Sequence, residues 1–117
     1  MKVFYYDYYT DEGIDAEDAR TADLAYVLDL FYNLTDEDDN FLGIAKNNQT
    51  LQFMFVEQDK WLAEVPYPNH INYQMYADYD ECVKLIKDCF TVGEIIISPK
   101  MKKVDIMNET LDDVLKR

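Results

Sequence analysis

The residue types that most often carry catalysis are few in this chain of 117 residues, and they stand apart from one another. The single histidine, His70, follows a proline-rich stretch, and the single serine, Ser98, precedes Pro99. Neither has the glycines two residues before and after that mark a nucleophile elbow. Three isolated glycines also provide no phosphate-binding loop of the Walker or dinucleotide type. The sequence therefore predicts a protein that is not an enzyme and that has no cofactor.

Cys82 and Cys89 are the remaining candidates for redox or zinc chemistry. They lie seven residues apart in a helical pattern, which separates them by about 10 Å along one helix face. That separation prevents a disulfide between them, and two cysteines with one histidine are too few ligands for a structural zinc site. We expect both thiols to be buried core groups, which suits a reducing compartment. Asp7 and Asp11 interrupt any signal-peptide segment and no long apolar run exists, so we expect a cytoplasmic protein without a membrane span.

The acidic run 36–40 is the most serious metal candidate, because it places side-chain oxygens at alternate positions as calcium loops do. Aligned with an EF-hand loop, however, it has Phe41 where glycine makes the sharp turn and Asn47 where a bidentate glutamate closes the site. The pattern therefore predicts a solvated acidic loop and no metal site. A small metal-binding regulator or enzyme that uses this loop stays open as a further alternative.

Charge is the strongest functional signal in the chain. The formal net charge is −13, and twelve of the 24 acidic residues fall within the first 40 residues, where Lys2 and Arg20 are the only bases. A surface this negative disfavours direct binding to nucleic acid or to anionic membranes, and it favours a basic protein partner. A small basic group lies near the C-terminus, and the sequence predicts no role for it; it comprises Lys100, Lys102 and Lys103.

Tyrosines stand beside acidic residues in two stretches, 5–12 and 76–80. Rigid aromatic rings supply contact area and carboxylates supply charge complementary to a basic site, which together are typical of a binding surface. The alternative is that the rings fill the edge of the core while the acids only keep the protein soluble. The predicted partner-binding residues are Tyr6, Asp7, Tyr8, Tyr9, Asp11, Glu12, Glu17, Asp18, Asp36, Glu37, Asp38 and Asp39.

Short strands in the middle of the chain must position these residues. Leu51, Phe53 and Phe55 alternate along one strand face, and the apolar Met54 and Val56 on the other face predict a central strand that is covered on both sides. Further strands are predicted at 3–9, 41–46, 61–65, 71–77, 94–98 and 101–107, with a tight Asn-rich turn at 46–50.

Apolar residues at helical spacing predict a first helix from about Asp15 to Leu34, with Thr21 as an alternative start. A second helix begins with the capping box formed by Asp78 and Glu81 and ends before Gly93, and a short helix follows at 111–117. The sequence thus predicts a single α+β domain over residues 1–117. It has an antiparallel sheet of four to six strands, two main helices packed on one face and a short C-terminal helix.

The segments 41–44, 50–53 and 61–66, set between an amphipathic helix and a closing helix, resemble small bacterial immunity proteins of polymorphic or contact-dependent toxin systems. The resemblance covers roughly 24–90 and consists of core positions, so no binding residue is carried over from it. It implies a cytosolic inhibitor that silences a toxin, often a basic nuclease, in the producing cell. The chain does not resemble the all-helical colicin-nuclease immunity proteins. The main alternative is a phage-encoded anti-defence protein whose carboxylates imitate nucleic-acid phosphates.

Overall fold

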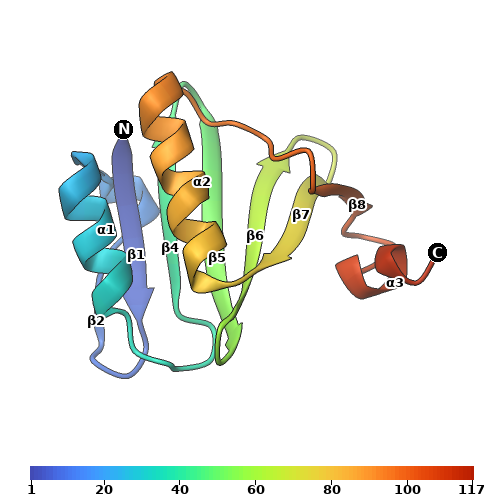
Figure 1. Ribbon diagram of the computed structural model, residues 1–117, viewed down its shortest axis with the longest axis horizontal. Helices are drawn as coiled ribbons and strands as arrows, with labels where there is room; N and C mark the ends of the chain where they lie inside the picture. The colour runs from blue at the N-terminus through green and yellow to red at the C-terminus, as the bar shows by residue number, and fades with distance from the viewer.

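The computed structural model describes all 117 residues, and one antiparallel sheet forms its frame (Figure 1). The sheet has the strand order β2-β1-β4-β5-β6-β7-β8, and β3 also pairs with β1. The α+β prediction is confirmed, but the predicted number of strands is too low. The strands are β1 (Lys2–Asp7), β2 (Glu12–Ile14), β3 (Arg20–Thr21), β4 (Phe41–Lys46), β5 (Gln49–Glu57), β6 (Lys60–Tyr67), β7 (Ile71–Ala77) and β8 (Lys102–Asp105). The helices are the 3-10 helix η1 (Ala16–Asp18), α1 (Leu24–Asn33), α2 (Tyr79–Val92) and α3 (Leu111–Leu115).

Tight turns connect the strands from β4 to β7, so neighbours in the sequence are neighbours in the sheet. The predicted turn between β4 and β5 is confirmed: Asn47 and Asn48 have φ values of 53° and 63°, the left-handed pair that a two-residue hairpin turn requires. Such short connections keep the register fixed, which matters below because side chains on one row of the sheet come from several strands.

Helices α1 and α2 lie side by side against one face of the sheet (Figure 1), and the core lies between them and the strands. The helices contribute Val27, Phe31, Cys82 and Ile86 to this core. Both cysteines are free and buried, as predicted, and burial raises the pKa of the Cys82 and Cys89 thiols. No helix in the structure is long and apolar enough to cross a membrane.

The opposite face of the sheet, which we call the open face, has no helix across its middle. Met54 and Val56 of β5 point to this face and are 37% and 39% exposed. The prediction that β5 is covered on both sides is therefore wrong. Apolar residues on both faces of a strand indicate a two-sided cover only when a second layer exists to pack there.

The first helix is shorter than predicted. Residues 12–21 form β2, η1 and β3 along the outer edge of β1, and α1 begins after Asp23, whose side chain accepts a hydrogen bond from the Tyr26 backbone N–H at 2.8 Å. Ile14 is the only buried residue between Glu12 and Thr21. The other apolar residues of this stretch, Ala16 and Ala19, are too small to form an apolar helix face. A helix there would have had almost nothing to pack on the sheet.

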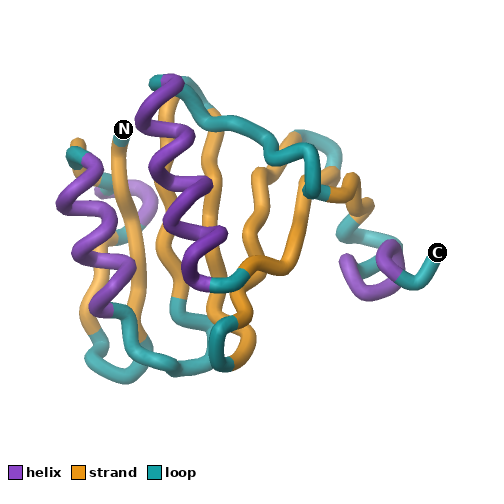
Figure 2. Tube along the Cα trace, viewed as in Figure 1, coloured by secondary structure: helices purple, strands orange, loops and turns teal.

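The predicted strand at 94–98 is absent. This stretch crosses from the end of α2 to β8 as an extended connection (Figure 2), with Ile95 buried in the core. Its β-branched residues suit a strand, but it is β8 that pairs with β7, over Ile71–Gln74 and in the register Ile71 with Asp105. Residues 94–98 therefore pair with no strand, because strand propensity alone does not form a ladder.

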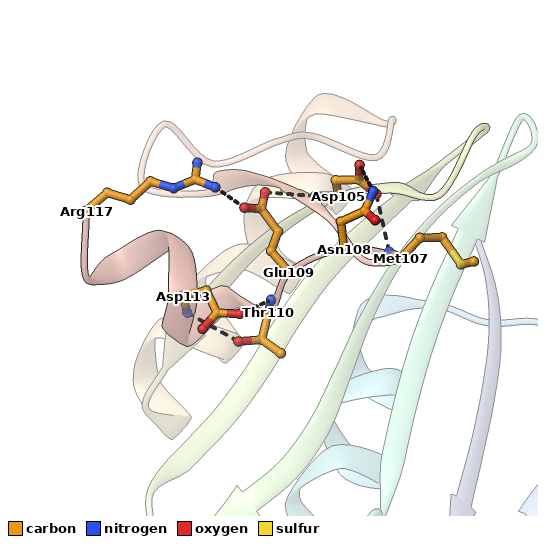
Figure 3. A network of polar contacts seen from close by, with 7 residues as sticks. All are labelled: Asp105, Met107, Asn108, Glu109, Thr110, Asp113 and Arg117. Atoms are coloured by element: carbon orange, nitrogen blue, oxygen red, sulfur yellow. Dashed lines mark hydrogen bonds and ion pairs between the residues drawn. The ribbon is translucent and has the colours of Figure 1, made fainter.

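The C-terminal segment is held by its own local hydrogen bonds (Figure 3). Asp105 accepts from the Met107 N–H and the Asn108 side chain at 3.2 and 2.8 Å, and Glu109 accepts from the Asp105 N–H and pairs with Arg117. These contacts return the chain toward the sheet. Farther along the chain, Leu111 of α3 is buried, and Asp112 accepts a hydrogen bond from the Tyr76 hydroxyl on the open face at 2.8 Å.

Candidate functional site

The most negative part of the molecule is one end of the sheet, where the β1–β2 turn, the α1–β4 loop and the β5–β6 turn meet (lower edge in Figure 2). We call it the acidic end. Its exposed acidic residues come from segments far apart in the sequence, and the bases there are few. The exposed acidic residues there include Asp11, Glu12, Asp36, Glu37, Asp38, Asp39 and Asp59, and Glu57 pairs with Lys60.

A buried carboxylate joins two of these segments. Asp7, at the end of β1, is 3% exposed and accepts hydrogen bonds from the Thr35 N–H and hydroxyl at 2.8 and 2.7 Å. It also accepts from the backbone N–H groups of Tyr9 and Thr10 at 3.0 and 3.3 Å. Asp7 was predicted to contact a partner, and that prediction is wrong, since its oxygens face inward and are all engaged. Its role is to hold the acidic loops together.

The pKa of Asp7 reflects this setting. Burial by itself raises the pKa of a carboxyl group, but the hydrogen bonds from Thr35 and from the Tyr9 backbone favour the charged form more strongly, and they lower the pKa of Asp7 to about 2. Asp7 is therefore ionised at neutral pH, and its charge is part of the fold.

Asn40 completes the connection and is fully buried. Its side-chain oxygen accepts from the Tyr8 N–H at 2.7 Å, and its amide donates to the Thr35 carbonyl at 2.9 Å. Its backbone carbonyl accepts from the Phe55 N–H of β5 at 2.8 Å. Asp7, Thr35 and Asn40 thus fix the β1–β2 turn and the α1–β4 loop against each other and against the sheet.

The predicted aromatic anchors differ in exposure. Tyr8 and Tyr9 are 55% and 74% exposed at the tip of the β1–β2 turn. Tyr6 is half-buried on the open face, packs against Tyr8 with 4.8 Å between ring centroids, and donates a hydrogen bond to Asp11. Two exposed rings therefore stand among the carboxylates, and Tyr6 packs against one of them, Tyr8.

A hollow of about 470 Å³ adjoins the acidic loops. Phe31, Trp61 and Tyr79 form part of its wall, with Tyr79 stacked on Phe31 at 5.3 Å between centroids. Tyr32, 74% exposed, stands at its rim together with Asp36 and Asp59. Tyr79 belongs to the stretch 76–80 that the sequence marked by its tyrosines and acids, although it was not among the predicted contacts. Tyr32 and Asp59 were not predicted at all, because only the fold brings α1, the β5–β6 turn and the start of α2 together.

Glu17 and Asp18 do not belong to the acidic end. They lie in η1, between β2, which pairs with Asp7 at the acidic end of β1, and β3, which pairs with Lys2 and Val3 at the other end. Both side chains are exposed. Two of the predicted contacts are therefore separated from the remainder along the length of β1.

The residues considered for catalysis and metal binding stay apart. His70 lies in the β6–β7 turn, and the Ser98 hydroxyl accepts a hydrogen bond from the Lys100 N–H at 3.2 Å in the α2–β8 connection. No group of three or more histidine, cysteine or acidic side chains comes together in a metal-binding arrangement. In the basic group, Lys100 pairs with Glu81 at 3.5 Å, while Lys102 and Lys103 are exposed on β8.

Comparison of the chain with protein-family models, with curated proteins and with solved structures found no match. The resemblance to immunity proteins therefore stays a prediction that depends on the pattern of core residues.

Proposed function

We propose that this protein is a non-catalytic inhibitor that binds a cationic protein through its acidic end, in the manner of an immunity protein that covers the basic active site of a toxin. One observation carries the proposal. The Asp7–Thr35–Asn40 network places the exposed acids of two loops on one rigid surface, with Tyr8 and Tyr9 beside them. A binding surface that is fixed before it meets its partner loses little conformational entropy on association.

The hollow beside the acidic loops supports the same function. A basic or aromatic side chain of the partner fits between Tyr32 and Tyr79, with Asp36 and Asp59 at the rim to pair with its charge. Helix α1 adds to the negative potential, because the acidic run 36–39 follows its C-terminus, where the helix dipole is negative.

The test starts from the gene neighbourhood: a toxin gene found beside the gene for this chain is coexpressed with it. The wild-type protein is expected to restore growth, and the variant D36K/E37K/D38K is expected to fail, with roughly 100-fold or greater loss of affinity for the purified toxin. Asp39 is left unchanged because its φ of 69° is unfavourable for lysine. A neighbouring phage gene cluster in place of a toxin gene would instead support the anti-defence alternative.

A matched control separates local contact from overall charge. The variant E17K/D18K/E94K reverses the same number of charges at exposed positions outside the acidic end. We expect it to protect cells and to bind with near wild-type affinity at 150 mM salt. If the two triple variants lose the same affinity for the toxin, the acidic end contributes only through long-range electrostatic attraction. If both variants bind like the wild type, the interface lies elsewhere on the protein.

A further inference from the structure

A second feature of interest lies in the middle of the open face, where the Glu64 carboxylate of β6 is surrounded by amide groups. It accepts hydrogen bonds from Gln52 at 2.7 Å, Gln74 at 3.0 Å and Asn72 at 3.3 Å. Gln52 of β5 and Gln74 of β7 are directly opposite Glu64 in the sheet register, which brings the side chains together. We call these four residues the carboxylate cluster.

The chemistry of the cluster fixes which atoms it presents outward. A carboxylate only accepts hydrogen bonds, so each amide must turn its NH₂ group toward Glu64 and its carbonyl oxygen away. None of these three carbonyl oxygens receives a hydrogen bond within the chain, and no buried polar side-chain atom lacks a partner, so the oxygens keep some contact with solvent, although Asn72 and Gln74 are only 6% and 7% exposed. Glu64 itself uses three of about four acceptor positions. Each amide donates only one of its two N–H groups to Glu64, so the cluster presents acceptor oxygens around a negative charge together with one further N–H on each amide.

Its negative charge has no partner in the chain. None of the four ion pairs of the protein includes Glu64. The base on the same row of the sheet is Lys102, which stands opposite Gln74 and also forms no ion pair. A half-buried carboxylate that is held in place by three donors and lacks a cation is prepared to receive one from outside.

The surroundings favour a cation with an apolar stem. Glu64 and Gln52 line a shallow pocket of about 180 Å³ whose other walls include Phe41, Met54 and Leu62. These three apolar residues are consecutive neighbours along the next row of the sheet and are at least partly exposed. The buried Phe4 ring supports Phe41 from below, since it lies over Gly43 and packs near Phe41, with 6.2 Å between centroids.

We propose that the carboxylate cluster binds the guanidinium group of an arginine presented by a protein partner that docks on the open face. Arginine offers five donors in a plane, which matches a carboxylate flanked by carbonyl oxygens. Its stem can lie along Met54 and Leu62, and its plane can stack on Phe41. A second copy of this chain is a poor occupant, because two molecules of net charge −13 repel each other. This site does not depend on the function proposed for the acidic end.

The probe is a short blocked peptide with one arginine between two leucines, titrated into ¹⁵N-labelled full-length protein. The side-chain NH₂ signals of Gln52, Asn72 and Gln74 are expected to shift together, since their hydrogen bonds to Glu64 weaken when the guanidinium arrives. Replacement of the arginine by citrulline, which keeps the shape without the charge, is expected to weaken binding about tenfold or more, and replacement by lysine is expected to weaken it as well.

Two variants decide the result. E64Q keeps the size of the side chain and is expected to weaken binding about tenfold or more, with an otherwise unchanged amide spectrum. D36K/E37K/D38K, which tests the acidic end, is expected to keep the shifts at the cluster. The proposal is overturned if the cluster signals do not move, if citrulline or lysine binds as well as arginine, or if E64Q binds like the wild type. If the cluster signals no longer shift in D36K/E37K/D38K but still shift in E64Q, the peptide binds at the acidic loops and not at the carboxylate cluster, which also overturns the proposal.

Discussion

Two carboxylates in this protein accept hydrogen bonds from three or more groups, and they lie in opposite settings. Asp7 is buried and is bonded by backbone N–H groups and a hydroxyl that belong to the loops it joins. Glu64 is half-buried on the open face and is bonded by three side-chain amides from neighbouring strands. The number of hydrogen bonds alone therefore does not distinguish the structural carboxylate of Asp7 from that of Glu64, which we propose binds a partner. Exposure to solvent, and whether the donors belong to the backbone, distinguish them.

The largest expected difference between the two is in stability. Asp7→Ala leaves the N–H groups of Tyr9, Thr10 and Thr35 and the Thr35 hydroxyl without their acceptor in a buried site, so we expect a loss of roughly 3 kcal/mol in the free energy of unfolding. Urea denaturation followed by circular dichroism measures it. A loss below about 1 kcal/mol would mean that water replaces the carboxylate, and that Asp7 does not hold the two loops together.

The second difference is in acid sensitivity. Because the pKa of Asp7 is lowered from its ordinary value of 3.8 to about 2, its charge stabilises the fold above about pH 4, and this stabilisation is lost as pH falls from 4 to 2. The contribution is about 2 kcal/mol. The difference in stability between wild type and Asp7→Asn should shrink over that pH range. A difference that stays constant from pH 5 to pH 2.5 would contradict the assignment.

The smallest expected effect is that of E64Q on stability. Water can reach the open face and replace a lost hydrogen bond, so we expect a change below about 1 kcal/mol in either direction. The same urea titration provides the measurement, with Asp7→Ala as the reference. A loss as large as that of Asp7→Ala would make Glu64 a structural residue, and the arginine site would lose its basis.

The strands that contain their own alternation of apolar and polar residues could be predicted from the sequence. In β6, Trp61, Ala63 and Val65 face the core as expected, and in β7 the same holds for Met75 and Ala77. The capping box of α2 was likewise predicted, because Asp78 and Glu81 satisfy each other within one helical turn. Such features depend on residues close in sequence.

The errors arose where distant residues decide the outcome. Residues 94–98 have strand propensity but pair with no strand, and Met54 with Val56 are apolar without a second layer above them. Asp7 was counted as a surface acid because nothing in its neighbourhood in the sequence signals the Thr35 donors, which lie 28 residues away. Tyr32 and Asp59 were not considered for the site for the same reason.

Composition and local pattern by themselves determined the negative charge, the α+β class and the identity of most core strands, because each depends on residue type or on short-range periodicity. Only the tertiary structure decided which acids share a surface and which carboxylate is open to a partner. Those properties depend on strand register and on hydrogen bonds between segments, such as Tyr8 with Asn40 and Glu64 with Gln74, that no local pattern encodes.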